Sequence, residues 1–365
     1  MVEEIVFHLG DCKTGTTSIQ AVLARGAWTL DGQAGRGIVY PAQVNHIPLA
    51  KSLWVPSEKP FEAERFASVR EAFTKSDARL GVISAEDFEF VDPELVAAAI
   101  ERHLGAWQGR IRLIAYVRPH AERLVSAFAE RSKQGLFVKP LAAMHDKLEA
   151  DGLLFYAPRF EKWRALFGDA FTLRPFLRNS LYKGDVVQDF FHWMTGGPDY
   201  EITRPTDQNE SLSVEDIAMM RALHKHIRAD SGRSLREVQQ ALGWYLADMV
   251  TSRPRQDGTK PRLHRALAKR VVATYAEDAA ALDAAFFDGT PMSDALAAAP
   301  GKAVDKPQSF RAEDHFNAEE LRLFDIWAAL LTRLMSADPE HFKWAVRAPD
   351  HRARLPPAAR ANPPG

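Results

Sequence analysis

The first apolar stretch of the chain is short, and a helical pattern follows it. Residues 5–9 are apolar apart from one histidine and end at Gly10. After a polar segment, Ile19, Val22 and Leu23 recur at the spacing of one helix face and stop before Gly26, a residue type that often ends helices. The pattern predicts a strand, a loop and a helix, in that order.

Two further runs rich in β-branched residues predict strands, and each lies close to a helical pattern. The runs RLGVISAE and RIRLIAYVR begin at Arg79 and Arg110, and the helical patterns cover residues 93–104 and 121–132. Strands that alternate with helices form a parallel sheet covered on both faces, so we expect an α/β fold of three layers. Ligands bind such sheets beyond the carboxyl ends of the strands, where GDCKTGTT, SAEDF and VRPHAERLVS would lie.

The second half of the chain has a different pattern. From about Ser211 the sequence becomes rich in alanine and leucine, with long amphipathic periods over residues 214–227, 235–250, 263–286 and 318–334. We therefore predict a core at residues 1–205, a helical C-terminal part at 206–345 packed on it, and a tail at 346–365. The tail is rich in proline and alanine and is expected to be disordered.

Composition narrows the class of protein. Of 365 residues, 46% are hydrophobic and 26% charged, and the formal net charge is -1, which argues against the broad positive field of a nucleic-acid-binding protein. The single cysteine, Cys12, excludes an internal disulfide and a cysteine-rich zinc site. No run of 18 apolar residues and no signal-like segment are visible. We expect a soluble, cytoplasmic protein without a membrane span.

The segment HLGDCKTGTT resembles a nucleotide-binding loop with its lysine displaced. Gly10 and Gly15 have the Walker A spacing, but Lys13 comes before the second glycine, and Thr16 and Thr17 come after it. A glycine turn that leads into a helix N-terminus is an anion cradle, which predicts a P-loop-like fold. A lysine in this place favours a ligand with one 5′-phosphate and a transferable group beyond it.

At this point the sequence resembles a known family. KTGTTS after HLG is similar to the loop that binds the 5′-phosphosulfate in sulfotransferases using 3′-phosphoadenosine 5′-phosphosulfate (PAPS), bacterial-type members included. PAPS is therefore the expected co-substrate, as the resemblance implies. On the same ground the loop residues expected to bind it are Lys13, Thr14, Gly15, Thr16, Thr17 and Ser18.

A second motif supports the same resemblance, which extends over about residues 4–200. Arg118 ends the strand RIRLIAYVR, and Ser126 follows eight residues later on the next predicted helix. The pair is similar to the arginine and serine with which the family holds the 3′-phosphate. A guanidinium can bind two phosphate oxygens while a hydroxyl donates to a third.

The resemblance also implies the roles of the catalytic residues. Lys13 would stabilise the leaving 5′-phosphate, and a general base would remove the proton of the acceptor hydroxyl. Two residues compete for the base: His46, after the strand GIVYP, which we slightly favour, and Glu86 in SAEDF. No metal is expected, because Lys13 and the loop amides supply the positive charge.

Two other functions stay open. A small-molecule kinase that uses ATP would need a lysine after Gly15, which the sequence lacks. A protein that binds a phosphorylated nucleotide without catalysis would need only the two anion motifs. For a sulfotransferase, the expected acceptor is a hydroxyl of a carbohydrate, glycolipid or small metabolite. The sequence does not indicate an oligomeric state.

Overall fold

The computed structural model describes residues 1–203, 211–231 and 234–346. The predicted tail lies outside these ranges apart from Val346. The chain packs into two compact units that interleave along the sequence. Of the described residues, the first unit contains 1–119, 155–203 and 275–296, and the second contains 120–154, 211–231, 234–274 and 297–346.

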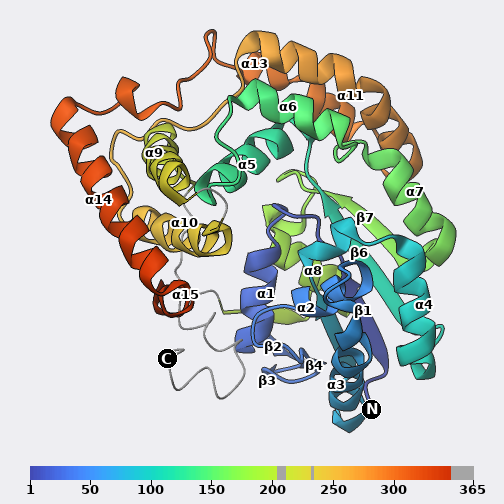
Figure 1. Cartoon of the computed structure of the whole chain (residues 1–365). Helices are drawn as coiled ribbons and strands as arrows, with labels where there is room; N and C mark the ends of the chain where they lie inside the picture. The colour runs from blue at the N-terminus through green and yellow to red at the C-terminus, as the bar shows by residue number, and fades with distance from the viewer. Residues whose placement is uncertain (204–210, 232–233, 347–365) are drawn as a thin grey trace. The chain divides into compact units, whose positions relative to one another are not determined.

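A five-stranded parallel sheet organises the first unit (Figure 1). The strand order is β4-β5-β1-β6-β7. The bounds are β1 Glu4–His8, β4 Ile38–Val39, β5 Leu80–Ser84, β6 Ile111–Val117 and β7 Phe171–Pro175. The chain first adds strands on one side of β1 and then on the other, so β1 lies where the strand order reverses. In open α/β sheets such a switch point is where ligands bind.

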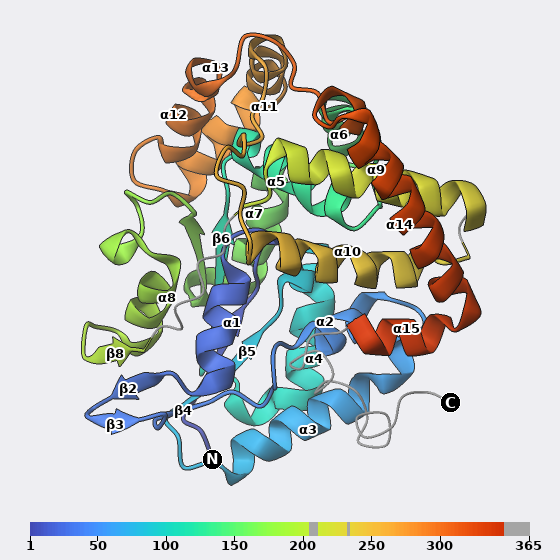
Figure 2. The same ribbon diagram turned by 90° about the vertical axis from the view of Figure 1, so that its left-hand side faces the viewer.

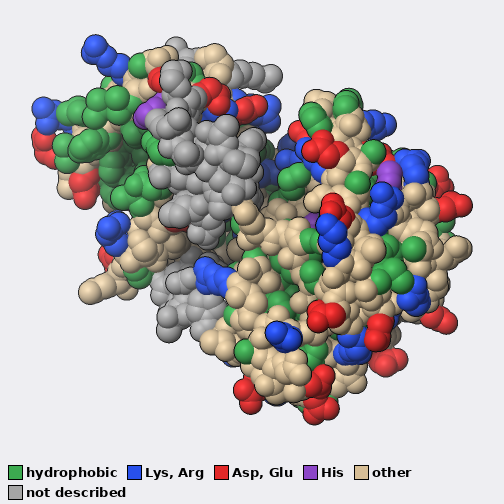
Figure 3. Space-filling view, turned by 90° about the horizontal axis from the view of Figure 1, so that it is seen from below, with side chains coloured by type: hydrophobic (Ala, Val, Ile, Leu, Met, Phe, Trp, Pro, Cys, Tyr) green, Lys and Arg blue, Asp and Glu red, His purple; other side chains and the backbone are tan. Residues whose placement is uncertain are grey.

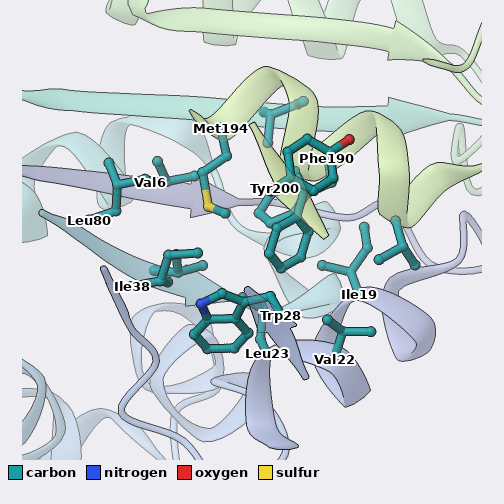
Figure 4. Close-up of a cluster of buried hydrophobic side chains, with 14 of the residues drawn as sticks. Val6, Ile19, Val22, Leu23, Trp28, Ile38, Leu80, Phe190, Met194 and Tyr200 are labelled. Atoms are coloured by element: carbon teal, nitrogen blue, oxygen red, sulfur yellow. The ribbon is translucent and has the colours of Figure 1, made fainter. Parts of the chain in front are cut away.

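Helices cover both faces of this sheet. One face carries α1 (Thr16–Arg25) and α8 (Val186–Thr195), and Figure 4 shows their side chains meeting those of β1 and β5 in one apolar cluster. On the other face lie α3 (Glu62–Lys75), α4 (Pro93–Leu104) and α7 (Tyr156–Phe167). There the ring of Phe73 lies against Gly81 of β5, and Phe160 stacks on Phe171 of β7. The predicted three-layer α/β architecture is confirmed.

Several elements of the first unit are absent from the sequence prediction. A small antiparallel sheet joins β2 (Trp28–Leu30), β3 (Gln33–Ala34) and β8 (Tyr200–Ile202) in the order β3-β2-β8. The helices α2 (Ile47–Trp54), α3 and α7 were also not predicted. Strands of two or three residues are too short to show an alternating pattern, because the signal needs four to eight residues.

The second unit is helical. Its helices are α5 (His120–Lys133), α6 (Leu141–Ala150), α9 (Val214–Ser231), α10 (Arg236–Thr251), α13 (Ala299–Lys302), α14 (Ala318–Ala337) and α15 (Pro339–Val346). Figure 2 draws α9, α10, α14 and α15 beside one another, and Ile227, Leu242 and Met335 form a buried cluster between them. The predicted helical character of the C-terminal part is confirmed.

The compact units divide the chain differently from the domains that we predicted from sequence. Residues 120–154 pack with the later helices, while 275–296 pack with the sheet. One reason is α11 (Arg265–Phe286), a helix of 22 residues that begins in one unit and ends in the other, where α12 (Pro291–Ala297) follows. The boundary at residue 205 stays a prediction about domains, because packing units need not fold independently.

Candidate active site

The loop after β1 lies between the carboxyl ends of two neighbouring strands. The amide of Asp11 donates to the carbonyl of Tyr116 in β6 (2.9 Å), and that of Ala85, just after β5, donates to the carbonyl of His8 (3.1 Å). A Cβ added to Gly10 would meet the Cα of Glu86 at 2.9 Å, so only glycine allows this close approach. The three segments that we expected at one edge of the sheet do begin there.

Helix α1 begins directly after this loop, at a glycine that the packing requires. Gly15 has φ 82° and is the N-cap, and no side chain caps the helix there. The first amides of a helix have no acceptor within it, so those of Thr16 and Thr17 are donors of the kind that bind anions. A Cβ on Gly15 would lie 2.6 Å from Cγ1 of Val186 and 3.3 Å from the ring of Phe176.

Side chains of the loop differ in their exposure. The hydroxyl of Thr14 is buried and donates to the carbonyl of Asp11 (2.5 Å), which braces the loop internally. Thr16 is buried and Thr17 exposed, while Ser18 and Lys13 are half-buried. Lys13 has φ 67°, a left-handed backbone conformation that is uncommon for a residue other than glycine.

Arg118 lies close to the same loop, because one aromatic ring, that of Phe176, contacts both. It follows β6 directly, and its guanidinium lies over the ring of Phe176 with 4.8 Å to the centroid. Phe176 is also the ring that limits Gly15. The lysine loop and Arg118 therefore meet at one edge of the sheet. Ser126 lies on α5, in the second unit, and its pairing with Arg118 stays a prediction.

Asp11, inside the loop, is held by an arginine that the sequence did not single out. Its carboxylate is 2% exposed and binds Arg159 of α7 in a bidentate ion pair, with 2.7 Å between Nη1 and Oδ1 and 2.5 Å between Nη2 and Oδ2. Burial alone would lower the pKa of Arg159, but Asp11 outweighs it, and the pKa is raised. The side chain of Arg159 lies over Phe160, with 4.3 Å to the ring centroid.

A second carboxylate contacts the loop from the other direction. The amide of Cys12 donates to Oε2 of Glu89 (3.0 Å), and Cys12 Sγ lies 3.8 Å from the carbonyl of Glu86. Glu89 is buried in the short 3-10 helix Glu86–Phe90 that follows β5. The thiol thus lies against backbone, which agrees with a packing role for Cys12.

Buried polar side chains connect the loop with Glu86. Gln20 of α1 donates from Nε2 to Oε2 of Glu86 (2.9 Å) and to Oγ of Ser84 (3.2 Å). The same hydroxyl lies 2.8 Å from Nδ1 of His8. Gln20 was not predicted, and its only sequence signal is its place one turn after the loop. The connection fixes the Glu86 carboxylate relative to α1.

His46 lies close to these residues, but its ring is engaged. It is 4% exposed, and the amide of Ser84 donates to its Nδ1 (3.2 Å), so the proton of the neutral imidazole is on Nε2. Nε2 is buried and has no hydrogen-bond partner in the described residues. Burial lowers the pKa of His46 to about 3. A ring in this state has no lone pair left for a substrate proton.

These buried groups make stability depend on pH. Burial lowers the pKa of His8 and of His46 to about 3 each, against 6.5 in the unfolded chain, so the unfolded state binds more protons and stability falls as the pH falls below 6.5. Burial raises the pKa of Asp87 to about 6, which acts in the opposite direction. We expect these three groups together to cause a net loss of about 3 kcal/mol between pH 7 and pH 5, and the buried His224, whose pKa burial lowers to about 4, to add about 2 kcal/mol to it.

Urea unfolding at the two pH values measures this loss. A His46→Asn variant is the control, because removing one of the two histidines should reduce their part of the loss by about half. An unfolding free energy that is equal at both pH values would contradict the burial of neutral histidines.

Possible metal ligands come together elsewhere. In the described residues, His145, Asp146 and Glu149 of α6 could offer one ligand atom each. The guanidinium of Arg270 contacts both His145 Nδ1 (2.6 Å) and the carboxylate of Asp146. Because the positively charged side chain of Arg270 already binds two of these three residues, the group is a poor site for a metal ion.

Comparisons with known proteins give few matches. No family model matches the sequence, and neither does any curated protein. Among solved structures, the chain is similar to the crystal structure of a sulfotransferase from Alicyclobacillus acidocaldarius, with 12% identity and a TM-score of 0.42 over 80% of this chain and 98% of that one. Such a likeness is too low to support conclusions about activity.

One further finding concerns membranes. Within the described ranges, every helix is either too short or too polar to cross a bilayer.

Proposed function

We propose that the protein is a sulfotransferase that moves a sulfuryl group from PAPS to a hydroxyl of a carbohydrate, glycolipid or other small metabolite. The observation that carries the proposal is the contact of Phe176 with both Gly15 and Arg118. A loop suited to a 5′-phosphate and an arginine suited to a 3′-phosphate are thereby next to each other at the switch point of the sheet. This adjacency supports a nucleotide phosphorylated at both positions as the donor.

The loop residues would bind the 5′ end of the donor. The amides of Thr16 and Thr17 and their hydroxyls would donate to phosphate and sulfate oxygens, and Ser18 would follow in the same turn. In the transfer step the acceptor oxygen forms a bond to sulfur while the bond between sulfur and the bridging oxygen breaks. The electron pair stays on the 5′-phosphate, where the ammonium group of Lys13 would stabilise it.

Glu86 is the stronger of the two candidate bases. A general base needs a free lone pair to accept the proton of the acceptor hydroxyl. In His46 the lone pair of the neutral ring, on Nδ1, already accepts a hydrogen bond from the Ser84 amide. Glu86 comes two residues after the end of β5, beside the loop, and a hydrogen bond from the side chain of Gln20 orients its carboxylate. We therefore propose that Glu86 accepts the proton of the acceptor hydroxyl, and that His46 holds the end of β5 in place through its hydrogen bond with Ser84.

A pair of variants tests this assignment. Glu86→Gln should lower kcat about 100-fold, because the amide keeps the shape but cannot accept the proton. His46→Asn should lower kcat less than about 5-fold and act mainly on stability. Steady-state kinetics with a sulfated-donor assay separate the two. A larger loss of kcat in His46→Asn than in Glu86→Gln would return the base to His46.

Calorimetric titration with adenosine 3′,5′-bisphosphate, the desulfated product of PAPS, tests the proposed function most directly. We expect tight binding, with ATP a poor competitor because it lacks the 3′-phosphate. Labelled PAPS should then transfer sulfate to a hydroxyl acceptor. Preference for ATP with magnesium would favour a kinase, and tight binding of the bisphosphate without any transfer would favour a non-catalytic binding protein.

A further inference from the structure

A buried acidic residue inside a loop that binds anions calls for an explanation. Asp11 lies two positions before Lys13, and its negative charge would repel a phosphate. Glu89 adds a second carboxylate, since it accepts the amide of Cys12. The loop therefore has negative charge on its inner side.

We propose that Arg159 is a positioning residue that cancels the charge of Asp11 and so sets the affinity of the loop for anions. The proposal rests on the function proposed above, since it concerns the same site. The two terminal nitrogen atoms of the guanidinium each bind one oxygen atom of the Asp11 carboxylate. This bidentate geometry holds the loop in place and also neutralises the charge of Asp11. Phe160 supports the guanidinium from below.

The placement of Arg159 is itself secured by the first unit. The amides of Tyr156 and Ala157, at the start of α7, donate to the two carboxylate oxygens of Asp278, at 2.9 Å each. Residue 159 comes in the same turn of the helix, so the capped end of α7 presents the guanidinium to the loop. Asp11 thus connects the loop to α7, and the positive charge of Arg159 offsets the negative charge that would otherwise repel a bound phosphate.

Opposite effects of two single variants separate charge from mere structure. Arg159→Gln keeps the negative charge of Asp11 and removes the cation facing it, which should weaken binding of adenosine 3′,5′-bisphosphate about 30-fold at low salt. Asp11→Asn keeps the cation and should leave affinity equal or higher. The double variant should return close to the wild-type affinity. High salt should reduce the differences.

Calorimetry on the four proteins, with unfolding curves to confirm folding, gives the answer. If Asp11→Asn weakens binding as much as Arg159→Gln does, the pair has only a structural role and the inference fails. If the wild type does not bind the bisphosphate, the proposed function fails, and inorganic pyrophosphate replaces it as the probe of the loop. Absence of the opposite effects with pyrophosphate, or of any binding, would overturn the inference as well.

A second, independent observation concerns one face of α14. Its side chains Ala328, Thr332 and Met335 are buried on the side that packs on α9. The opposite side carries an apolar stripe at helical spacing, whose members are each 43% to 55% exposed: Leu323, Ile326, Trp327, Leu330 and Leu334. In Figure 3 hydrophobic side chains gather on the side where Figure 1 draws α14 and α15.

From this stripe we infer that α14 pairs with α14 of a second copy of the chain. Five side chains at half exposure present roughly 500 Å² of apolar surface, the size at which patches on monomers are functional. Two copies together reach roughly 1000 Å², the lower limit of a specific interface. Glu319 is paired with Arg322, and the carboxylate of Asp325 lies 3.7 Å from Nδ1 of His226, so acidic side chains balance the nearby arginine and the stripe has no excess of cations to attract an anionic membrane.

Sedimentation equilibrium of the full chain tests the pairing. We expect a dimer for the wild type and a monomer for Trp327→Glu, with unchanged circular dichroism because the residue is exposed. The control is Leu166→Glu, an equally exposed leucine on α7, which should stay dimeric. A wild type that is monomeric at all concentrations, or that instead sediments with phospholipid vesicles through Trp327, would overturn the inference.

Discussion

Lys13→Ala is expected to lower kcat for sulfate transfer about 1000-fold while binding of adenosine 3′,5′-bisphosphate weakens less than about 10-fold. The difference arises because a lysine beside the bridging oxygen acts most strongly when negative charge develops there. The amides of Thr16 and Thr17 and the guanidinium of Arg118 stay in place to bind the product.

The measurement combines single-turnover transfer of labelled sulfate with calorimetry of the product nucleotide. Lys13→Arg is the matched control: it keeps the charge and spreads it over a planar group, so it should recover part of the rate. Equal losses in rate and in affinity for Lys13→Ala would mean that the lysine binds the ground state and the transition state alike, which contradicts its assigned role.

Gly15→Ala is expected to destabilise the protein by about 3 kcal/mol and to abolish measurable nucleotide binding. Two costs add: the left-handed conformation at φ 82°, and a methyl group 2.6 Å from Val186 Cγ1. The loop can avoid the contact only by moving its amides, and the anion site would move with them.

Gly196→Ala is the matched control for this prediction. Gly196 ends α8 with φ 79°, and nothing lies within 4 Å of an added Cβ. It should show the conformational cost alone, about 1 kcal/mol, with full nucleotide binding. Urea unfolding and calorimetry on both variants isolate the steric part. Equal effects of the two substitutions would show that Val186 yields without cost.

The sequence could predict those parts of the candidate site that are formed by residues close together in the chain. The period change between β1 and α1, the glycine spacing and the displaced lysine identified the loop, because strand, turn and helix N-terminus are all local. The position of Arg118 followed from the end of a clear strand. Helix 93–104 was predicted with the bounds that α4 has.

The parts that sequence could not predict depend on contacts between distant residues. Asp11 and Arg159 are 148 positions apart, so the acid in the loop looked like a disadvantage until its partner was known. His46 could not be compared with Glu86 from sequence, since the decisive contact is a backbone amide 38 positions away. In the proposed assignment, the burial and tautomer of His46, and not its residue type, favour Glu86 as the base.

The interleaved path of the chain has a practical consequence for truncation. A fragment that stopped at residue 205 would contain every residue of the lysine loop and Arg118, yet it would lack Asp278 and Phe286. Without them the first amides of α7 lose their acceptor and the rings of Phe160 and Phe171 lose a neighbour. Expression of the apparent nucleotide-binding half by itself should therefore give insoluble material, although the missing segment lies far from the phosphate loop in sequence.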